Sequence, residues 1–172
     1  MFDDPLEILT LCHEKVRRFA RLALKLGDHV ARHGSDDAAA DAAQKVLRYF
    51  NMAAPLHHDD EDLDVYPALI ALNELSIDQD KKKVLVDSIH RLQKEHAELG
   101  LLWIEIKQWL EQVEQNKTIT PPESLGHFAD VYIRHAEREE SQIYPYISLL
   151  NADTLREIGT SMAMRRGAKT TT

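Results

Sequence analysis

The sequence predicts an all-α protein, an up-down-up-down four-helix bundle followed by a short C-terminal fifth helix. Three observations support this fold class. Helix-forming residues dominate the 172-residue chain, which has only six glycines and six prolines and lacks the β-branched and aromatic runs typical of sheets. Apolar residues recur at helical spacing. Capping signals separate four long segments by short turns, which make consecutive helices antiparallel neighbours.

Capping signals define the first two helices. Asp4 can cap the first helix, Pro5 suits its first turn and Glu7 completes a capping box. Gly34 is expected to end this helix. The second helix is expected over about residues 37–73, where Pro55 should kink it or split it into two pieces. Its inward positions are expected to be Val46, Leu47, Phe50, Leu56 and Leu63.

The remaining helices follow from the same signals. Residues 76–79 (Ser-Ile-Asp-Gln) offer a capping box for a third helix that runs to about residue 115, with Val84 on its apolar face. Residues 120–123 (Thr-Pro-Pro-Glu) are expected to begin a fourth helix that continues to about residue 150. A short fifth helix over about residues 151–164 precedes a polar tail.

Length and charge limit the classes of protein to consider. We expect one domain over residues 1–172, with its core at about 5–150 and a short helix and tail at 151–172. A formal net charge of -8, with no basic stripe except Arg165-Arg166 with Lys169 near the end, argues against nucleic-acid binding. No apolar run is long enough to span a membrane and no signal peptide is evident, so we expect a cytoplasmic protein.

Two copies of one short motif carry the chemical signal. Residues 57–67 and 135–145 both read His-x3-Glu-x4-Tyr-Pro, and they fall on the second and fourth helices. Side chains four residues apart lie on one helix face, so His57 with Glu61, and His135 with Glu139, can share a metal. The alternative for a single copy is a solvated surface pair. Two copies in register favour a metal site.

The other two helices place histidines at the same depth. Counted from the turns, His13 and His96 lie within about a turn and a half of this layer. We therefore expect them to be ligands, although a core histidine with a hydrogen-bond partner is the alternative for either one alone. His58 lies about 100° around the helix from His57, so it faces a neighbouring helix or the edge of the site, and we expect it to be a ligand.

Other polar residues near the motifs are not expected to bind metal. His29 and His33 should be surface residues, and His90 and His127 do not share the ligand face. Several acidic residues are expected beside the ligands or facing solvent: Asp59, Asp60, Asp62, Glu137 and Glu140. Tyr66 and Tyr144 lie about 140° around the helix from their glutamates, so packing is the expected role of each. Cys12, as the single cysteine, excludes an internal disulfide and a cysteine-rich zinc site.

Over residues 5–166 the chain resembles the hemerythrin-like, or HHE cation-binding, family. The residues that carry the resemblance are His13, His57-His58-x-x-Glu61-Asp62, Glu95-His96 and His135-x3-Glu139-Glu140. The resemblance implies a diiron centre bridged by Glu61 and Glu139. Oxygen-carrying hemerythrins have a second histidine four residues from that on helix three, where this chain has Leu92 and Gly100. His58 is the expected replacement, and simple oxygen carriage is not expected.

Three functions remain open on this evidence. The first is a cytoplasmic protein that binds or senses O2, NO or iron through two carboxylate-bridged iron ions. The second is a diiron enzyme acting on peroxide or O2, and the third is a metal that only stabilises the bundle. Imidazole and carboxylate ligands without thiolate suit iron, with zinc and manganese as alternatives. The sequence does not decide whether the protein is an enzyme, nor its oligomeric state.

Overall fold

The computed structural model describes residues 4–167, and these form helices with no strand. In chain order the elements are α1 (Pro5–His33), α2 (Asp37–Arg48), η1 (Tyr49–Ala53), α3 (Ala54–Asp60), η2 (Glu61–Val65), α4 (Tyr66–Ile70), α5 (Gln79–Glu114), α6 (Ser124–Gln142), η3 (Tyr144–Leu149) and α7 (Ala152–Arg165). Segments η1 and η2 are π-helical, whereas η3 is a 3-10 helix.

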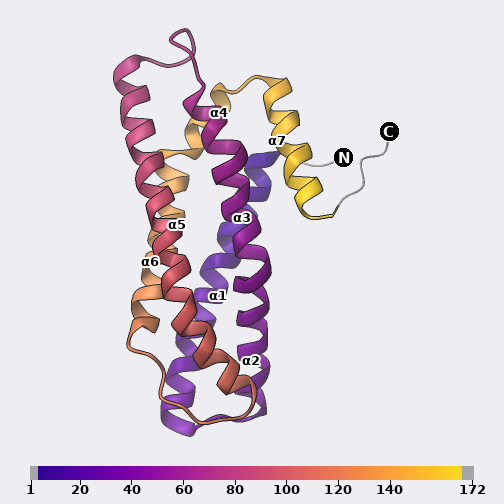
Figure 1. Ribbon diagram of the computed structural model, residues 1–172, viewed down its shortest axis with the longest axis vertical. Helices are drawn as coiled ribbons and strands as arrows, with labels where there is room; N and C mark the ends of the chain where they lie inside the picture. Colours follow the sequence, from indigo (N-terminus) through magenta and orange to yellow (C-terminus); the bar gives the residue numbers. More distant parts are fainter. Residues whose placement is uncertain (1–3, 168–172) are drawn as a thin grey trace.

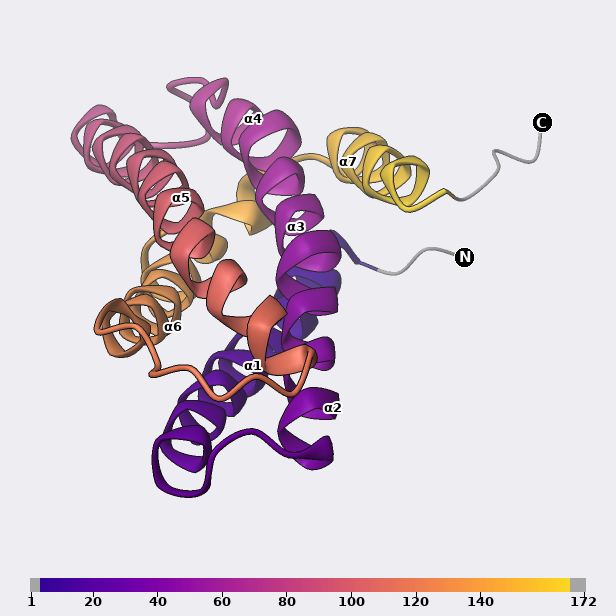
Figure 2. The same cartoon turned by 60° about the horizontal axis from the view of Figure 1, so that its bottom comes forward.

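The elements assemble into an elongated bundle. Segments α2 to α4 run end to end as one column, called the second column below, which stands beside α1, α5 and α6 (Figure 1). The end-on view in Figure 2 shows these four columns around a common axis, with α7 outside them. The last helix packs on α1, α3 and η2. The expected four-helix bundle with a C-terminal extra helix is therefore confirmed.

The second column contains two π-helical segments where the sequence predicted a proline kink. Segments η1 and η2 each end two residues before a proline, Pro55 and Pro67. A proline cannot donate to the carbonyl four residues earlier, and its ring crowds that carbonyl. The wider π turn accommodates both effects and keeps the column continuous. The column ends at Ile70, three residues earlier than expected.

Two helix starts and one helix end differ from the expected boundaries. Helix α5 is capped by Asp78, which accepts from two backbone N–H groups at 3.0 and 3.2 Å, rather than by Ser76. Helix α6 begins only at Ser124. Thr120 and Pro121 each precede a proline, and a residue in that position disfavours the α conformation. It ends at Gln142, and a 3-10 helix around Pro145 replaces its expected last turns.

The apolar core is divided into two clusters along the bundle. One cluster includes Val46, Phe50 and Phe128, and the other includes Tyr66, Leu69 and Ile143. Leu63 and Val84 were expected to point inward, but they are 63% and 64% exposed. Leu63 lies inside η2, where the π turn changes the angle between successive side chains. On α5 the neighbouring Leu85, and not Val84, is buried in the core. Within residues 4–167, no helix is both long and apolar enough to cross a membrane.

Candidate metal centre

A layer of buried histidines and glutamates lies between the helices. His13 comes from α1, His57 and Glu61 from the second column, and His135 and Glu139 from α6, and all five are buried. His96, on α5, has a side chain that is 7% exposed. Buried ionisable groups are costly unless they are paired or bind a metal, so the layer is a candidate functional site.

The layer contains two groups that share both glutamates. The first group comprises His13 and His57, and the second comprises His96 and His135, each together with Glu61 and Glu139. Within each group the candidate ligand atoms lie within 4.8 Å of one another. Two adjacent groups with common carboxylates are the arrangement that a bridged metal pair requires.

The oxygens of each glutamate divide between the two groups. Glu61 Oε1 lies 3.6 Å from His57 Nε2 and 3.9 Å from His13 Nε2, and Glu61 Oε2 lies 3.5 Å from His96 Nε2. Glu139 shows the same division. Its Oε2 lies 3.0 Å from His13 Nε2, while its Oε1 lies 3.2 Å from His135 Nε2 and 3.7 Å from His96 Nε2. Each carboxylate thus turns one oxygen toward each group.

His58 joins the second group. A ligand atom of His58 lies within 4.8 Å of ligand atoms of His96 and His135. Its ring stacks on that of His96, with centroids 4.0 Å apart. The structure therefore brings together all seven residues that the sequence singled out, and it offers three imidazoles to the second group and two to the first.

Three of the histidines have a carboxylate on their other ring nitrogen. His13 Nδ1 lies 3.0 Å from Glu140, His96 Nδ1 lies 2.9 Å from Asp62, and His135 Nδ1 lies 3.0 Å from Glu95. Arg17 and Arg138 in turn form ion pairs with Glu140 and Glu95. Such outer carboxylates orient metal-binding imidazoles and leave the inner nitrogen free to coordinate. Glu95 had been noted in the sequence only as the neighbour of His96.

Several buried atoms in and beside the layer lack a hydrogen-bond partner in the protein. Buried side-chain atoms without a hydrogen bond include His57 Nδ1, His58 Nε2, Glu61 Oε2, Asp62 Oδ1, His96 Nε2, His135 Nε2 and Glu139 Oε2. Unpaired buried nitrogens and oxygens of this kind are expensive, and six of them come from the candidate ligands, His58 included. Imidazole nitrogens and carboxylate oxygens are also the donor set that suits iron. The residues present therefore fit a metal pair.

The pKa values of the buried histidines shift in opposite directions. Burial, together with the charge of His13, lowers the pKa of His57 well below its ordinary value, and burial with the neighbouring His96 does the same for His58. Burial opposes the charge on His135, but Glu139 outweighs it and raises the pKa of His135 to about 9. Burial likewise opposes the charge on His96, but hydrogen bonds with Asp62 and the two glutamates raise its pKa to about 12. An imidazole must be neutral to coordinate, so filling the second group would release protons from both His96 and His135.

The two motif tyrosines face the layer, so the expectation that they only pack is wrong. Tyr66 donates a hydrogen bond to Glu139, and Tyr144 donates one of 2.8 Å to Glu61. The 140° angle assumed for Tyr66 holds for an α-helix, but η2 is π-helical and the Tyr66 N–H bonds the carbonyl of Glu61 five residues earlier. Tyr144 follows the end of α6, where Ile143 has a φ of -116°. The Tyr-Pro pair in both motifs was the available signal.

The histidines that were set aside lie elsewhere. His29 pairs with Asp36 at 2.9 Å near the end of α1, and His33 stacks beside it. His90 and His127 are exposed. None of these four belongs to the groups found among residues 4–167.

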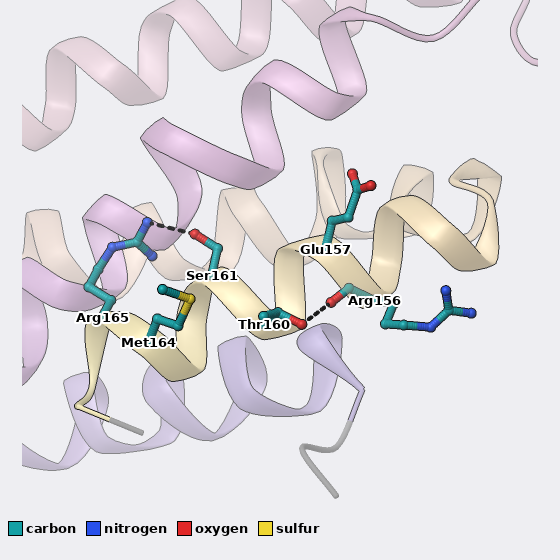
Figure 3. A pocket seen from close by; sticks show the side chains of 6 residues that line it. All are labelled: Arg156, Glu157, Thr160, Ser161, Met164 and Arg165. Carbon is teal, nitrogen blue, oxygen red and sulfur yellow. Dashed lines mark hydrogen bonds between the residues drawn. The ribbon is translucent and has the colours of Figure 1, made fainter. Parts of the chain in front are cut away.

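A third buried carboxylate lies one residue before Glu61. Asp60 is fully buried, contrary to the expectation that it lies beside the ligands or faces solvent, and α7 supplies its partners. Arg166 donates to Asp60 at 2.5 and 3.1 Å, and Arg165 donates both to Asp60 and, at 2.9 Å, to Asp64. Arg165 also bonds Ser161, beside a surface hollow on α7 that contains none of the candidate ligands (Figure 3). These ion pairs attach the last helix to the second column.

Comparisons with known proteins agree with this geometry. A family model described as the hemerythrin HHE cation binding domain matches residues 4–147. A protein of Haemophilus influenzae (strain ATCC 51907 / DSM 11121 / KW20 / Rd), described as uncharacterized, is 35% identical over 170 residues, which cover 98% of this chain and 93% of the relative. The chain belongs to the hemerythrin HHE cation binding domain family.

Proposed function

We propose that this hemerythrin HHE protein holds two iron ions, bridged by Glu61 and Glu139, and uses them in the cytoplasm to bind or sense a small ligand such as O2, NO or peroxide. One observation carries the proposal. Both glutamates turn one oxygen toward each of two histidine groups. A single metal would need only one group, and a surface ion pair would need neither.

The proposed ligands divide unequally between the two positions. His13 and His57 serve the first position, and His58, His96 and His135 serve the second, each with one oxygen from Glu61 and one from Glu139. The first position therefore has fewer protein donors, which favours a small ligand there. An iron pair supplies ligand binding coupled to a change of oxidation state, which no side chain here provides. The buried residues of the site hold the donor nitrogens and oxygens in position and exclude water from them.

Zinc and manganese are the alternative metals, and an enzyme acting on peroxide or O2 is the alternative function. The first position's smaller donor set is what favours the enzyme, since reactive metal sites keep a coordination position open. A metal that only stabilises the fold would be expected to have a closed set of protein ligands at both positions.

Optical spectroscopy tests the proposed function. The protein is loaded with Fe2+ without oxygen and is then exposed separately to O2, NO and peroxide. A reproducible spectral change with one ligand, reversed when that ligand is removed, supports binding or sensing. Sustained consumption of peroxide or O2 would favour the enzyme. An iron-loaded protein whose spectrum responds to none of the three contradicts a small-ligand role and leaves the structural one.

A further inference from the structure

The two tyrosine hydroxyls cross between the sequence motifs. The first motif comprises His57, Glu61 and Tyr66, and its tyrosine donates to Glu139 of the second motif. The tyrosine of the second motif, Tyr144, donates to Glu61 of the first at 2.8 Å. Each motif thus supplies a bridging glutamate and the hydroxyl that holds the glutamate of the other motif.

Each tyrosine also sits against the same position as the oxygen it holds. Tyr144 bonds Oε1 of Glu61, the oxygen that faces the first group. Its hydroxyl also lies 3.0 Å from His13 Nε2, and its ring stacks on His13 with an interplanar angle of 7°. Tyr66 bonds Oε1 of Glu139, the oxygen that faces the second group, and its ring stacks on His96 at 11°. The arrangement has approximate two-fold symmetry, with one tyrosine at each metal position.

Burial makes these contacts restrictive. Tyr66 is 0% exposed and Tyr144 is 4% exposed, so neither hydroxyl has water as an easy alternative partner. A glutamate side chain rotates about several bonds. A fixed donor on one oxygen selects the orientation in which the other oxygen faces the opposite group.

We propose that Tyr66 and Tyr144 are reciprocal positioning residues, each holding the glutamate of the opposite motif in its bridging orientation. This inference rests on the proposed metal pair. It explains why the motif extends beyond histidine and glutamate to tyrosine, and why one copy alone forms no complete position. It also gives the π turn of η2 a role, since that turn brings Tyr66 to the face of Glu61.

Removal of each hydroxyl tests the positioning role. Tyr66→Phe and Tyr144→Phe are expected to weaken the binding of at least one iron ion about 10-fold or more, the usual cost of losing an outer partner of a ligand. We also expect a changed optical spectrum of the iron-loaded protein in each variant. Affinity is measured by competition with a chelator of known strength.

Tyr49→Phe is the matched control. Its buried hydroxyl donates to the backbone carbonyl of Cys12 at 3.1 Å and touches no carboxylate of the layer. Loss of a buried hydroxyl should lower the melting temperature of all three metal-free variants, but Tyr49→Phe should leave iron affinity and spectrum unchanged. A structural role alone would make the three variants alike.

The crossing is tested in the metal-free protein by proton NMR of the hydroxyl groups. The signal assigned to Tyr66 should shift in Glu139→Gln and not in Glu61→Gln, and the signal assigned to Tyr144 should respond in the opposite way. Responses to the glutamate of the same motif would overturn the inference. Phenylalanine variants with wild-type iron affinity and spectrum would also overturn it, while leaving the metal pair intact. A wild-type chain with fewer than two ions would overturn the proposed function and, with it, this inference.

Discussion

Asp60 and Glu61 are neighbours in the chain and both are fully buried, but the protein treats them differently. Asp60 accepts hydrogen bonds from two guanidinium groups, those of Arg165 and Arg166. Glu61 receives one hydrogen bond from Tyr144, and its Oε2 has no hydrogen-bond partner. Asp60, which only supports the fold, has both of its oxygens hydrogen-bonded within the protein. Glu61 has one oxygen without a hydrogen-bond partner, at the place where a metal pair would bind.

The largest expected effect is on iron content and comes from neutralising Glu61, the carboxylate with an unpaired oxygen. Glu61→Gln should reduce the iron content from two ions per chain to one or none, because a neutral amide cannot bridge two cations. The metal-free variant should be as stable as the wild type or more so, since a buried, poorly paired charge has been removed. Metal analysis and urea unfolding measure the two effects. Retention of both ions would show that Glu61 is not a bridge.

Neutralising Asp60 should have the opposite pattern, a loss of stability with no loss of iron. Asp60→Asn leaves Arg165 and Arg166 without their shared partner, and we expect a loss of about 2–3 kcal/mol in the free energy of unfolding, less than for a fully buried pair because both guanidinium groups are partly exposed. Iron content should remain at two. Asp64→Asn, which affects only Arg165, is the control and should cost less. Loss of iron without loss of stability in Asp60→Asn would abolish the distinction between the two carboxylates.

The third imidazole of the second position is the next test. His58→Leu should weaken the binding of one iron ion by at least the roughly 10-fold cost of losing an outer partner, while the other ion remains bound. His90→Leu makes the same chemical change at an exposed histidine and should leave both ions in place. Chelator competition separates the two affinities. Equal affinities in the two variants would remove His58 from the ligand set.

The smallest effect is expected outside the ligands. Glu95→Gln removes the carboxylate 3.0 Å from His135 Nδ1 and should weaken iron binding about 10-fold. Glu98 and His127 form a similar pair between the same two helices, 3.4 Å apart, but both side chains are exposed. Glu98→Gln should therefore leave iron binding unchanged. An equal effect of the two substitutions would mean that the outer carboxylate acts through the helix contact and not through the metal.

The bundle and the layer of candidate ligands could be predicted because both depend on local spacing. Asp4 is expected to cap the first helix and Gly34 to end it, through contacts within a few residues, and the structure uses both. A histidine and a glutamate four residues apart share a face on any α-helix. Counting residues from the turns then placed His13 and His96 at the correct depth.

The missed features depend on long-range contacts or on irregular turns. The partners of Asp60 lie 105 and 106 residues further along the chain, so nothing near Asp60 announced its burial. The sequence predicts a packing role for Tyr66 because it predicts an α-helix where η2 is π-helical. Leu63, in the same segment, was placed inside for the same reason. A second proline in the column, Pro67, was the local signal for that irregular turn.

The iron content of the folded chain tests the account most directly. The protein is loaded with Fe2+ under anaerobic conditions, loosely bound metal is removed, and iron and protein are measured in the same sample. The account predicts two iron ions per chain in the wild type, because two groups of ligands share Glu61 and Glu139. One ion or fewer per chain would contradict the paired centre.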